Sequence, residues 1–558
     1  MNVSRRDLLL GTAGLVGGIF FTPVPWRVLD DVAIWTQNWP WIPQPPRGPV
    51  TTRLAPCTLC SSGCALRVRM AAGSPVGISG AAFHPLTKGA LCPLGFAAHQ
   101  LNWHPARVRE VRHGGHGASW EEARAAFEKA CDEGPVAVVD GRSGRAASTV
   151  LQSFAARHHS PYEVVLNAEE RSLTPYSNWS AVPMSSLGYD VENARTIVSF
   201  GAPLLDGWGV PGRFTHLWAE RAAGMRDPQL RLIQIEPKQS RTAAGAWRWV
   251  PISQGSEALL AAGLAKVLVE ERLVSVEGPV PPASFADAAP RTGLTSAAIR
   301  ELAYTMVERR PTLFISADEN PAIAALHVLL GAVGNVGGIV SKSAHPFTRP
   351  PARATGTPTR AVLIDSTVPW DFVPPSGGEI FRFAAWDGGG NRADWLLPAP
   401  GFLEETTDLP TAPTSAVATY AIAPSLLTPA AAVKTAAEFL LQIDSSLPTI
   451  EQTVQERCEE IFRVRRGAVH RGGPAAAPVT GFDCAAKLEE DLRAGGVWLD
   501  RPRSVPALKC SLNEWPTEDR VHAAANWAAA WQPPVMPPLA AKLYQESGLR
   551  EAPQRNRP

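Results

Sequence analysis

The chain has 558 residues, more than one hydrophobic core supports, so about two to four packed domains are expected. Lys and Arg number 53 and Asp and Glu 52, which leaves a net charge of +1. This balance excludes the basic surface of a nucleic-acid-binding protein and the polybasic patch of a protein held on a membrane by charge.

The first residues predict an export signal. Ser4-Arg5-Arg6-Asp7 precedes an apolar run from Leu8 to Phe21, a pattern similar to the twin-arginine signals that send folded, cofactor-loaded proteins across a membrane. The run is shorter than the roughly twenty residues of a full span, and no clear small-x-small cleavage site follows it. Cleavage further along the chain and retention as a membrane anchor therefore both stay open. A retained segment would place Trp26, Trp35, Trp39 and Trp41 near the lipid headgroups.

Four of the eight cysteines predict a metal centre. Cys57-x2-Cys60-x3-Cys64 places three thiols within eight residues, and Cys92 follows after 27 more. Four thiolates that converge in this way suit a [4Fe–4S] cluster. Structural zinc, which usually takes two Cys pairs, and disulfides are the alternatives. The cluster is expected in a domain over residues 46–115.

The surroundings of the four cysteines fit a cluster. Gly63 and Pro93 suit a tight backbone, and Ala55, Leu59, Ala65 and Leu91 would form an apolar wall. Histidines of this region are expected at the surface or in partner contacts; they are His84, His99, His104, His113 and His116. The remaining cysteines are expected to be buried free thiols, with one disulfide left open; they are Cys131, Cys458, Cys484 and Cys510.

Strands and helices alternate after the cluster segment. The predicted helices are Trp120–Cys131, capped by Ser119 with Glu122, and then Ala146–Arg157, Glu257–Glu271 and Ala322–Val333. The predicted strands are Pro135–Asp140, Thr196–Phe200, Leu230–Ile235 and Thr312–Ser316. This alternation predicts a parallel sheet with helices on both faces. Ligands of such folds bind beyond the carboxyl ends of the strands, so the loops at Gly141, Gly201 and Glu236 would line a pocket. The Gly-rich turn over 140–145 is interpreted as a plain turn before a helix, with a phosphate site as the alternative.

The chain resembles the molybdopterin oxidoreductases that carry a bis-guanine-dinucleotide molybdenum cofactor. The resemblance covers roughly residues 50 to 440. It is carried, in the family's order, by Cys57–Cys92, Ala194–Ala202, Ile235–Ala243, Trp249–Leu260, Leu330–Gly338 and Ala393–Ala399. It implies an α/β fold in which the small N-terminal [4Fe–4S] domain precedes parallel-sheet domains of the molybdopterin oxidoreductase type.

Three departures from the family's pattern bear on the cofactor. The family usually has Lys two residues after the fourth Cys, where this chain has Leu94. The metal-ligand stretch matches Glu170–Pro175, where Ser172 is the nearest candidate and a solvated loop serine is the expected reading. The segment after Leu440 is rich in Ala, Arg and Pro and lacks the strand pattern of the family's C-terminal β-barrel-like cap. We therefore expect the cap to be missing and molybdopterin to be absent.

Family members that kept the scaffold and lost molybdenum occur in membrane quinone-linked complexes. The segments Ile34–Trp41 and Pro537–Arg550 look similar to the molybdopterin-binding-like subunit of menaquinone reductase complexes and to the related domain of alternative complex III. The resemblance implies a multihaem cytochrome c subunit, a ferredoxin-like iron–sulfur subunit and an integral membrane quinone-binding subunit as partners.

The resulting prediction is a largely non-catalytic iron–sulfur subunit of a periplasm-facing menaquinone reductase complex, which transfers electrons, acts as a scaffold, or does both. The alternative is a catalytic molybdenum or tungsten bis-pterin oxidoreductase acting on a small oxo-compound. The predicted parts are the signal and Trp-rich arm over 1–45, the cluster domain over 46–115, α/β parts over 116–345 and 346–450, and an Ala/Pro-rich region over 451–558.

Overall fold

The computed structural model describes residues 4–21, 48–225, 227–274, 288–342, 359–365, 378–387, 393–412, 414–429, 432–473, 475–501, 508–510 and 514–516. The chain divides into two compact units, Met1–Pro49 and Val50–Pro558. The four Trp residues of the predicted N-terminal arm and the segment 537–550 lie outside the described residues.

The first unit contains helix α1 (Arg5–Phe21), which covers the predicted signal segment. Its apolar side chains, among them Leu8, Leu9 and Phe20, are exposed. Within the described ranges, no helix combines the length and the apolar character needed to cross a membrane.

The second unit begins with a three-stranded antiparallel sheet of β1 (Val50–Pro56), β2 (Ala65–Ala71) and β3 (Ser74–Gly80). Alternate residues of β2 face inward, so that Val68 is buried while Arg67 and Arg69 are exposed. Helix α3 (Pro93–Ala97) and the 3-10 helix η1 (Ala98–Trp103) follow this sheet. Strands and helices thus hold both ends of the predicted cysteine motif.

A four-stranded parallel sheet has the order β11-β10-β9-β12. Its strands are β9 (Thr196–Phe200), β10 (Arg231–Ile235), β11 (Arg248–Val250) and β12 (Thr312–Ser316). One face is covered by α10 (Glu257–Glu270), α12 (Ser296–Glu308) and α13 (Pro321–Leu329), and α8 (Pro211–Arg221) packs on the other. This confirms the predicted parallel sheet with helices on both faces.

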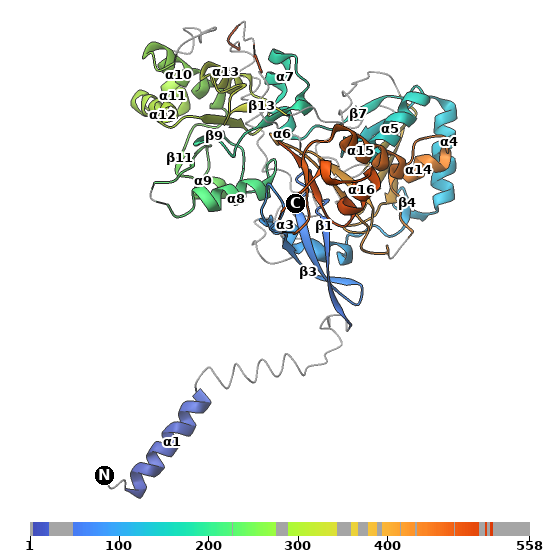
Figure 1. The fold of residues 1–558 in the computed structure, drawn as a ribbon, viewed down its shortest axis with the longest axis horizontal. Helices are drawn as coiled ribbons and strands as arrows, with labels where there is room; N and C mark the ends of the chain where they lie inside the picture. The colour runs from blue at the N-terminus through green and yellow to red at the C-terminus, as the bar shows by residue number, and fades with distance from the viewer. Residues whose placement is uncertain are drawn as a thin grey trace. The chain divides into compact units, whose positions relative to one another are not determined.

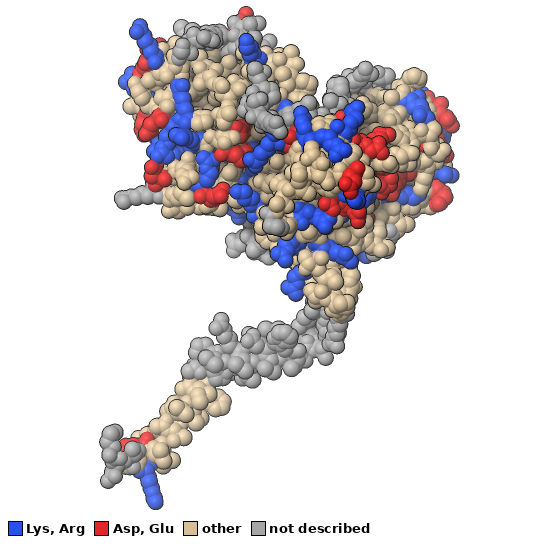
Figure 2. Space-filling model, in the orientation of Figure 1, with Lys and Arg blue, Asp and Glu red and all other residues tan. Residues whose placement is uncertain are grey.

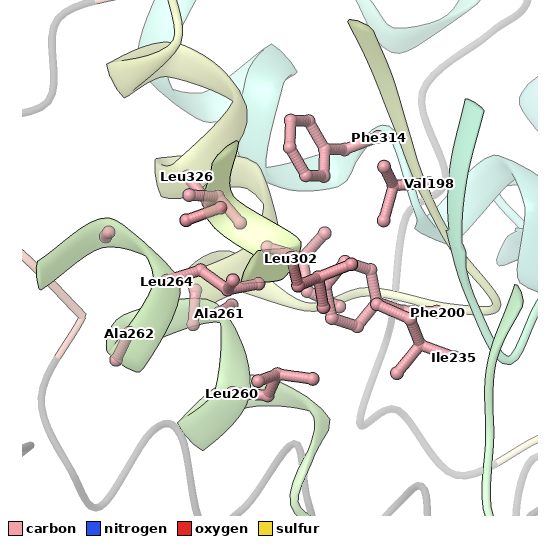
Figure 3. Close-up of a cluster of buried hydrophobic side chains, with 14 of the residues drawn as sticks. Val198, Phe200, Ile235, Leu260, Ala261, Ala262, Leu264, Leu302, Phe314 and Leu326 are labelled. Carbon is pink, nitrogen blue, oxygen red and sulfur yellow. The ribbon is translucent and has the colours of Figure 1, made fainter. Parts of the chain in front are cut away.

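The core between this sheet and its helices is mainly apolar, with the buried His327 of α13 packed against Phe314. Figure 3 shows Val198, Phe200 and Phe314 of the strands pointing towards Leu264 and Leu326 of the helices. The residues adjacent to these in the same strands, such as Ile197 and Leu313, belong to the core on the opposite face of the sheet. A strand buried on both faces is a continuous apolar run, which is why these strands could be predicted from the sequence.

A seven-stranded sheet, whose strands β4 and β7 are labelled in Figure 1, has the order β5-β4-β16-β15-β14-β6-β7. Strands β16 to β7 run parallel, and β4 and β5 form an antiparallel edge. The strands are β4 (Val111–His113), β5 (His116–Ala118), β6 (Val136–Asp140), β7 (Tyr162–Val164), β14 (Ala361–Asp365), β15 (Glu379–Ala384) and β16 (Trp395–Pro398). Helices α4 (Trp120–Glu133), α5 (Ala146–Arg157) and α14 (Ala436–Ile443) pack on it. The predicted capping box of Ser119 and Glu122 is present. Strands from both sides of residue 345 share this sheet, and the domain limits stay predictions.

A further sheet, of five antiparallel strands, has the order β17-β18-β21-β19-β20. Its strands are β17 (Thr407–Pro410), β18 (Ala418–Ala423), β19 (Ala468–His470), β20 (Ala477–Pro478) and β21 (Val497–Asp500). Helices α15 (Ile450–Val464) and α16 (Ala485–Arg493) cover it. The expectation that the chain lacks strands after Leu440 was wrong. Strands of two to four residues owe their stability to distant partners such as β18, which a local pattern does not reveal.

Shorter elements connect these sheets. They are α6 (Ala168–Arg171), α7 (Thr174–Ser180), α9 (Arg241–Gly245), α11 (Ala288–Thr292), the 3-10 helices η2 (Met184–Ser186) and η4 (Val479–Gly481), and the antiparallel pair β8 (Leu187–Tyr189) and β13 (Ile339–Ser341). On the face drawn in Figure 2, acidic and basic side chains both spread over the second unit, as the balanced composition implies.

Candidate functional site

The loop between β1 and β2 carries three of the four predicted ligands. Pro56 and Ala65 are the last paired residues of the two strands. The backbone N–H of Cys57 then donates to the carbonyl of Cys64 at 2.8 Å, which closes the loop at its base. Gly63 has a φ of +60°, a conformation that favours glycine. The hairpin therefore folds Cys57, Cys60 and Cys64 into one turn.

Cys92 reaches the site from the other end of the domain. It is the N-cap residue of α3, and Pro93 takes the first position of that helix. The backbone N–H of Gly95 donates to the Cys92 sulfur at 3.4 Å. The Cys92 sulfur therefore caps the first turn of α3.

The four thiols are electrostatic neighbours. Burial raises the pKa of the Cys57 and Cys64 thiols, and the nearby Cys60 and Cys92 thiolates would raise it further. Cys60 is exposed as a residue, yet desolvation of its thiol and the charge of Cys92 raise its pKa as well. Four thiolates gathered in this way repel one another unless a cation lies among them.

These residues fit an iron–sulfur cluster. Thiolates are the ligands of such clusters, and metal binding takes the protons from thiols whose pKa is otherwise raised. A bound cluster would accept and release single electrons. Among the described residues, no three or more His, Cys, Asp or Glu side chains already have metal-site geometry. The assignment of Cys57, Cys60, Cys64 and Cys92 as ligands thus rests on spacing, burial and electrostatic coupling.

Helix α8 packs against one side of the cysteine loop. Ser62 donates its hydroxyl to the carbonyl of Gly209 at 3.5 Å. A Cβ on Gly212 would lie 3.2 Å from the Cys64 sulfur and 2.8 Å from the carbonyl oxygen of Ala90. The first turn of α8 therefore touches the loop without any side chain between them. We call Gly209 and Gly212 the α8 flank.

The start of α5 packs against the other side. Arg145, the N-cap residue of α5, is buried and donates through Nη2 to the carbonyl of Thr58 at 3.3 Å. Its charge lowers the pKa of Cys57, against the larger effect of burial. Asp408 accepts from the backbone N–H of Ala146 at 2.6 Å and pairs with Arg457. We call Arg145, Asp408 and Arg457 the α5 flank.

Further charges lie at the carboxyl ends of β6 and β14. Arg142 pairs with Glu405 at 3.1 Å, and Asp140 accepts from the backbone N–H of Arg142 at 2.9 Å. Burial raises the pKa of Asp365 to about 6, although Arg142 opposes the shift. The turn over 140–145, interpreted as a plain turn, is thus part of a buried ionic network.

Among the described residues, the histidines near the motif belong to no group of three or more His, Cys, Asp or Glu side chains with metal-site geometry. His84 is buried, and its Nδ1 accepts from the backbone N–H groups of Leu86 and Thr87 at 3.2 and 3.1 Å. Burial lowers the pKa of His84 to about 4, so it is neutral at pH 7. His113 stacks on Trp395 with ring centres 4.0 Å apart. The expectation of a surface or partner position was therefore wrong for His84, which orders the backbone before Cys92, and for His104, which is also buried and accepts from the backbone N–H of Ala106 at 3.1 Å.

Ser172, the nearest candidate for a metal ligand, is not a solvated loop serine. It lies at the end of α6 and is 2% exposed. Its hydroxyl donates to the carbonyl of Glu169 at 2.7 Å and shares a 2.8 Å hydrogen bond with the Tyr189 hydroxyl. The earlier expectation was wrong because α6 and β8 enclose the serine. Leu94, in α3, is half-buried and offers no hydrogen-bond donor.

The three loops predicted to line a pocket belong to two sheets. Gly201 and Glu236 follow the adjacent strands β9 and β10, and Gly201 donates its N–H to the carbonyl of Ile235 at 2.9 Å. Glu236 is 4% exposed and accepts from Gln234 and from the backbone of Ser240. Gly141 follows β6 of the seven-stranded sheet. The loops at Gly201 and Glu236 therefore meet at one edge of the four-stranded sheet, whereas the loop at Gly141 lies at an edge of the seven-stranded sheet.

All eight cysteines lie within the described residues, and none of them is paired in a disulfide. Cys458 is fully buried, as expected, whereas Cys484 is exposed. The prediction of buried free thiols is therefore wrong for Cys484, which stands at the start of α16. The site also includes Gly212, which the sequence did not single out, and Arg145, which the sequence placed only in the turn over 140–145; each contacts a segment far away in the chain.

Comparison with known proteins agrees with the site. Residues 51–102 match the molybdopterin oxidoreductase Fe4S4 domain. Over 403 residues the chain is 30% identical to the menaquinone reductase, molybdopterin-binding-like subunit of Nitratidesulfovibrio vulgaris, which covers 68% of this chain and 58% of that protein. It is 23% identical over 304 residues to the arsenate respiratory reductase molybdopterin-containing subunit of Shewanella sp.. That match covers 49% of this chain and 33% of the Shewanella protein. The chain thus spans less than two thirds of the length of these relatives.

A solved structure shares the fold. Acetylene hydratase from Pelobacter acetylenicus superposes with a TM-score of 0.57 and 13% identity over 80% of this chain and 74% of that protein. At this identity the likeness concerns the fold alone. The Fe4S4 domain and the relative from N. vulgaris, by contrast, show that the chain belongs to the molybdopterin oxidoreductase superfamily.

Proposed function

We propose that this chain is an iron–sulfur subunit of a periplasm-facing membrane quinone reductase complex that works without a molybdenum cofactor. The observation that carries the proposal is the contrast between two sets of residues. The four cysteines that would hold a cluster lie close to one another. Leu94, by contrast, offers no hydrogen-bond donor to a pterin, and Ser172 does not offer a free hydroxyl to a metal. The Ser172 hydroxyl is already engaged by Glu169 and Tyr189.

The role in the complex is electron transfer, scaffolding, or both. A single cluster passes electrons only between partner centres that lie close to it. The relative from N. vulgaris is named as a subunit of a menaquinone reductase, which supports a multi-subunit assembly. We propose the partners given above: a multihaem cytochrome c, a ferredoxin-like protein and a membrane quinone-binding subunit. Export by the twin-arginine route belongs to the same proposal.

Metal analysis of the purified full-length chain tests the cofactor content. We expect about four irons and four sulfides per chain, as one [4Fe–4S] cluster requires, with molybdenum, tungsten and pterin at background. One molybdenum or tungsten per chain would instead support the alternative, a bis-pterin oxidoreductase acting on a small oxo-compound. A relative named as a molybdopterin-containing reductase favours that alternative.

The position in the cell is tested with the signal. Replacing Arg5 and Arg6 by Lys keeps the charge and removes the arginine pair, so the chain should remain in the cytoplasm. The matched control is the single replacement Arg53→Lys in β1. Extraction of the wild-type chain from membranes with detergent should return it with c-type haem and with quinone reductase activity. Export of the double variant at the wild-type level would contradict the proposed route.

A further inference from the structure

Arg145 is a buried cation that reaches the cysteine loop from another part of the fold. It is 6% exposed, and its Nη2 donates to the carbonyl of Thr58, the residue that follows Cys57. Its Nη1 is buried and has no hydrogen-bond acceptor within the described residues. Leaving a buried donor unsatisfied is unfavourable, so packing alone does not explain an arginine at this position.

The backbone around Arg145 is held rigidly. Asp408, which is fully buried, accepts from the N–H of Ala146 at 2.6 Å. Arg457 donates to the carbonyls of Gly144 and Arg145 at 3.0 and 3.3 Å and pairs with Asp408. Both ends of this clamp come from distant segments, β17 and α15. The fold therefore fixes the backbone of Arg145, and this places the guanidinium at the cysteine loop.

The charge of Arg145 persists at neutral pH. Burial lowers its pKa to about 10, and the neighbouring charge of Arg142 acts in the same direction. Glu405, Asp408 and Asp365 oppose the shift. Arg142 has its own direct partner in Glu405, and Arg457 has one in Asp408. Arg145 is thus the member of the network whose guanidinium contacts the cysteine loop.

We propose that Arg145 sets the reduction potential of the cluster by holding a fixed positive charge and a spare N–H donor beside the Cys57 end of the loop. Reduction adds one electron and no proton, so the reduced state carries one more negative charge. A nearby cation stabilises that state, and charge and hydrogen bonds near the sulfurs are what tune such potentials. The inference rests on the cluster and not on the quinone-linked role, and it holds whether or not the complex forms.

A potentiometric titration of the purified full-length chain, with dithionite as reductant and electron paramagnetic resonance as readout, tests the inference. Arg145→Gln should lower the potential, so that the ratio of reduced to oxidised cluster at a fixed ambient potential falls at least tenfold, about 59 mV for one electron. Arg145→Lys keeps the charge and should change the ratio less than threefold. Arg157→Gln, which removes the same charge from the exposed end of α5, is the matched control and should also stay within threefold.

Iron and sulfide are measured in each variant, so that potentials are compared only between chains with full clusters. A fully loaded Arg145→Gln variant with the wild-type potential would overturn the inference, as would an equal shift in Arg157→Gln. If Arg145→Gln does not assemble a cluster, Glu405→Gln serves as the test with the opposite sign. Removing a carboxylate that offsets the arginine should raise the potential, and an unchanged or lowered potential would overturn the inference.

Discussion

The two flanks of the cysteine loop hold it by different means. The α8 flank touches Cys64 and Ser62 through glycine backbone, and it brings no charged side chain to the contact. The α5 flank brings Arg145, which is buried and whose supporting residues Asp408 and Arg457 form an ion pair. One side is defined by the lack of a side chain, and the other by a long charged one.

The two flanks should therefore affect different properties. The α8 flank fixes the position of the cysteine loop, and the α5 flank changes the relative free energies of the oxidation states of the cluster. Close backbone packing leaves the loop little room to move, because interiors are packed as densely as organic crystals. A fixed charge leaves the geometry alone and changes the relative stability of the oxidation states. We therefore expect damage to the α8 flank to reduce cluster content, and damage at the α5 flank to affect folding stability and potential.

The largest effect should come from removing a ligand that the α8 flank touches. Cys64→Ser takes away one of the four thiolates, and the chain should lose most of its iron and its visible absorption. The matched control is Cys484→Ser, at an exposed position at the start of α16, which should retain about four irons. Iron analysis of the two purified variants decides the matter, and equal iron in both would contradict the ligand assignment.

A smaller effect is expected at the base of the α5 flank. Asp408→Asn leaves the Arg457 charge without its partner and weakens the cap of α5, so unfolding should become easier by about 3 kcal/mol or more. Glu451→Gln breaks an exposed pair with Arg493, where less than about 1 kcal/mol is expected. Thermal unfolding of the cluster-loaded chains compares the two. Similar losses in both variants would mean that burial of the pair is not what matters.

The smallest expected change in stability lies at the α8 flank. An alanine Cβ at position 212 would come within 2.8 Å of the Ala90 carbonyl and 3.0 Å of the Thr87 methyl carbon. Gly212→Ala should therefore destabilise the chain by about 1–3 kcal/mol and lower its iron content. Gly77→Ala in β3, where nothing lies within 4 Å of an added Cβ, is the matched control. If Gly212→Ala keeps full iron and its unfolding temperature, the account of the α8 flank fails.

Local pattern predicted much of the fold. Strands Thr196–Phe200 and Thr312–Ser316 and helix Ala146–Arg157 have the limits that the sequence indicated, because apolar runs and turn residues mark them. The helix expected over 322–333 ends at Leu329, since Gly331 takes a φ of +67° beyond it. The cysteine motif was recognisable because its spacing is local.

The rest depends on contacts between distant segments. Ser172 is buried against Tyr189, and Arg145 contacts Thr58 in the loop between β1 and β2. Strand β19 pairs with β20 and β21, and β21 in turn pairs with β18. Neither composition nor periodicity shows which distant segment will pack against a given residue, so these contacts could not be predicted.

The strand order of the two parallel sheets has a consequence for synthesis on the ribosome. All strands of the four-stranded sheet lie between Thr196 and Ser316, so that region can close while the chain is still growing. Neighbouring strands β6 and β14 of the seven-stranded sheet are separated by the whole of that region. We therefore expect β6 to remain without its neighbour β14 until translation has passed Asp365. The nascent chain should then depend longest on chaperones at β6, the first strand of its α/β region.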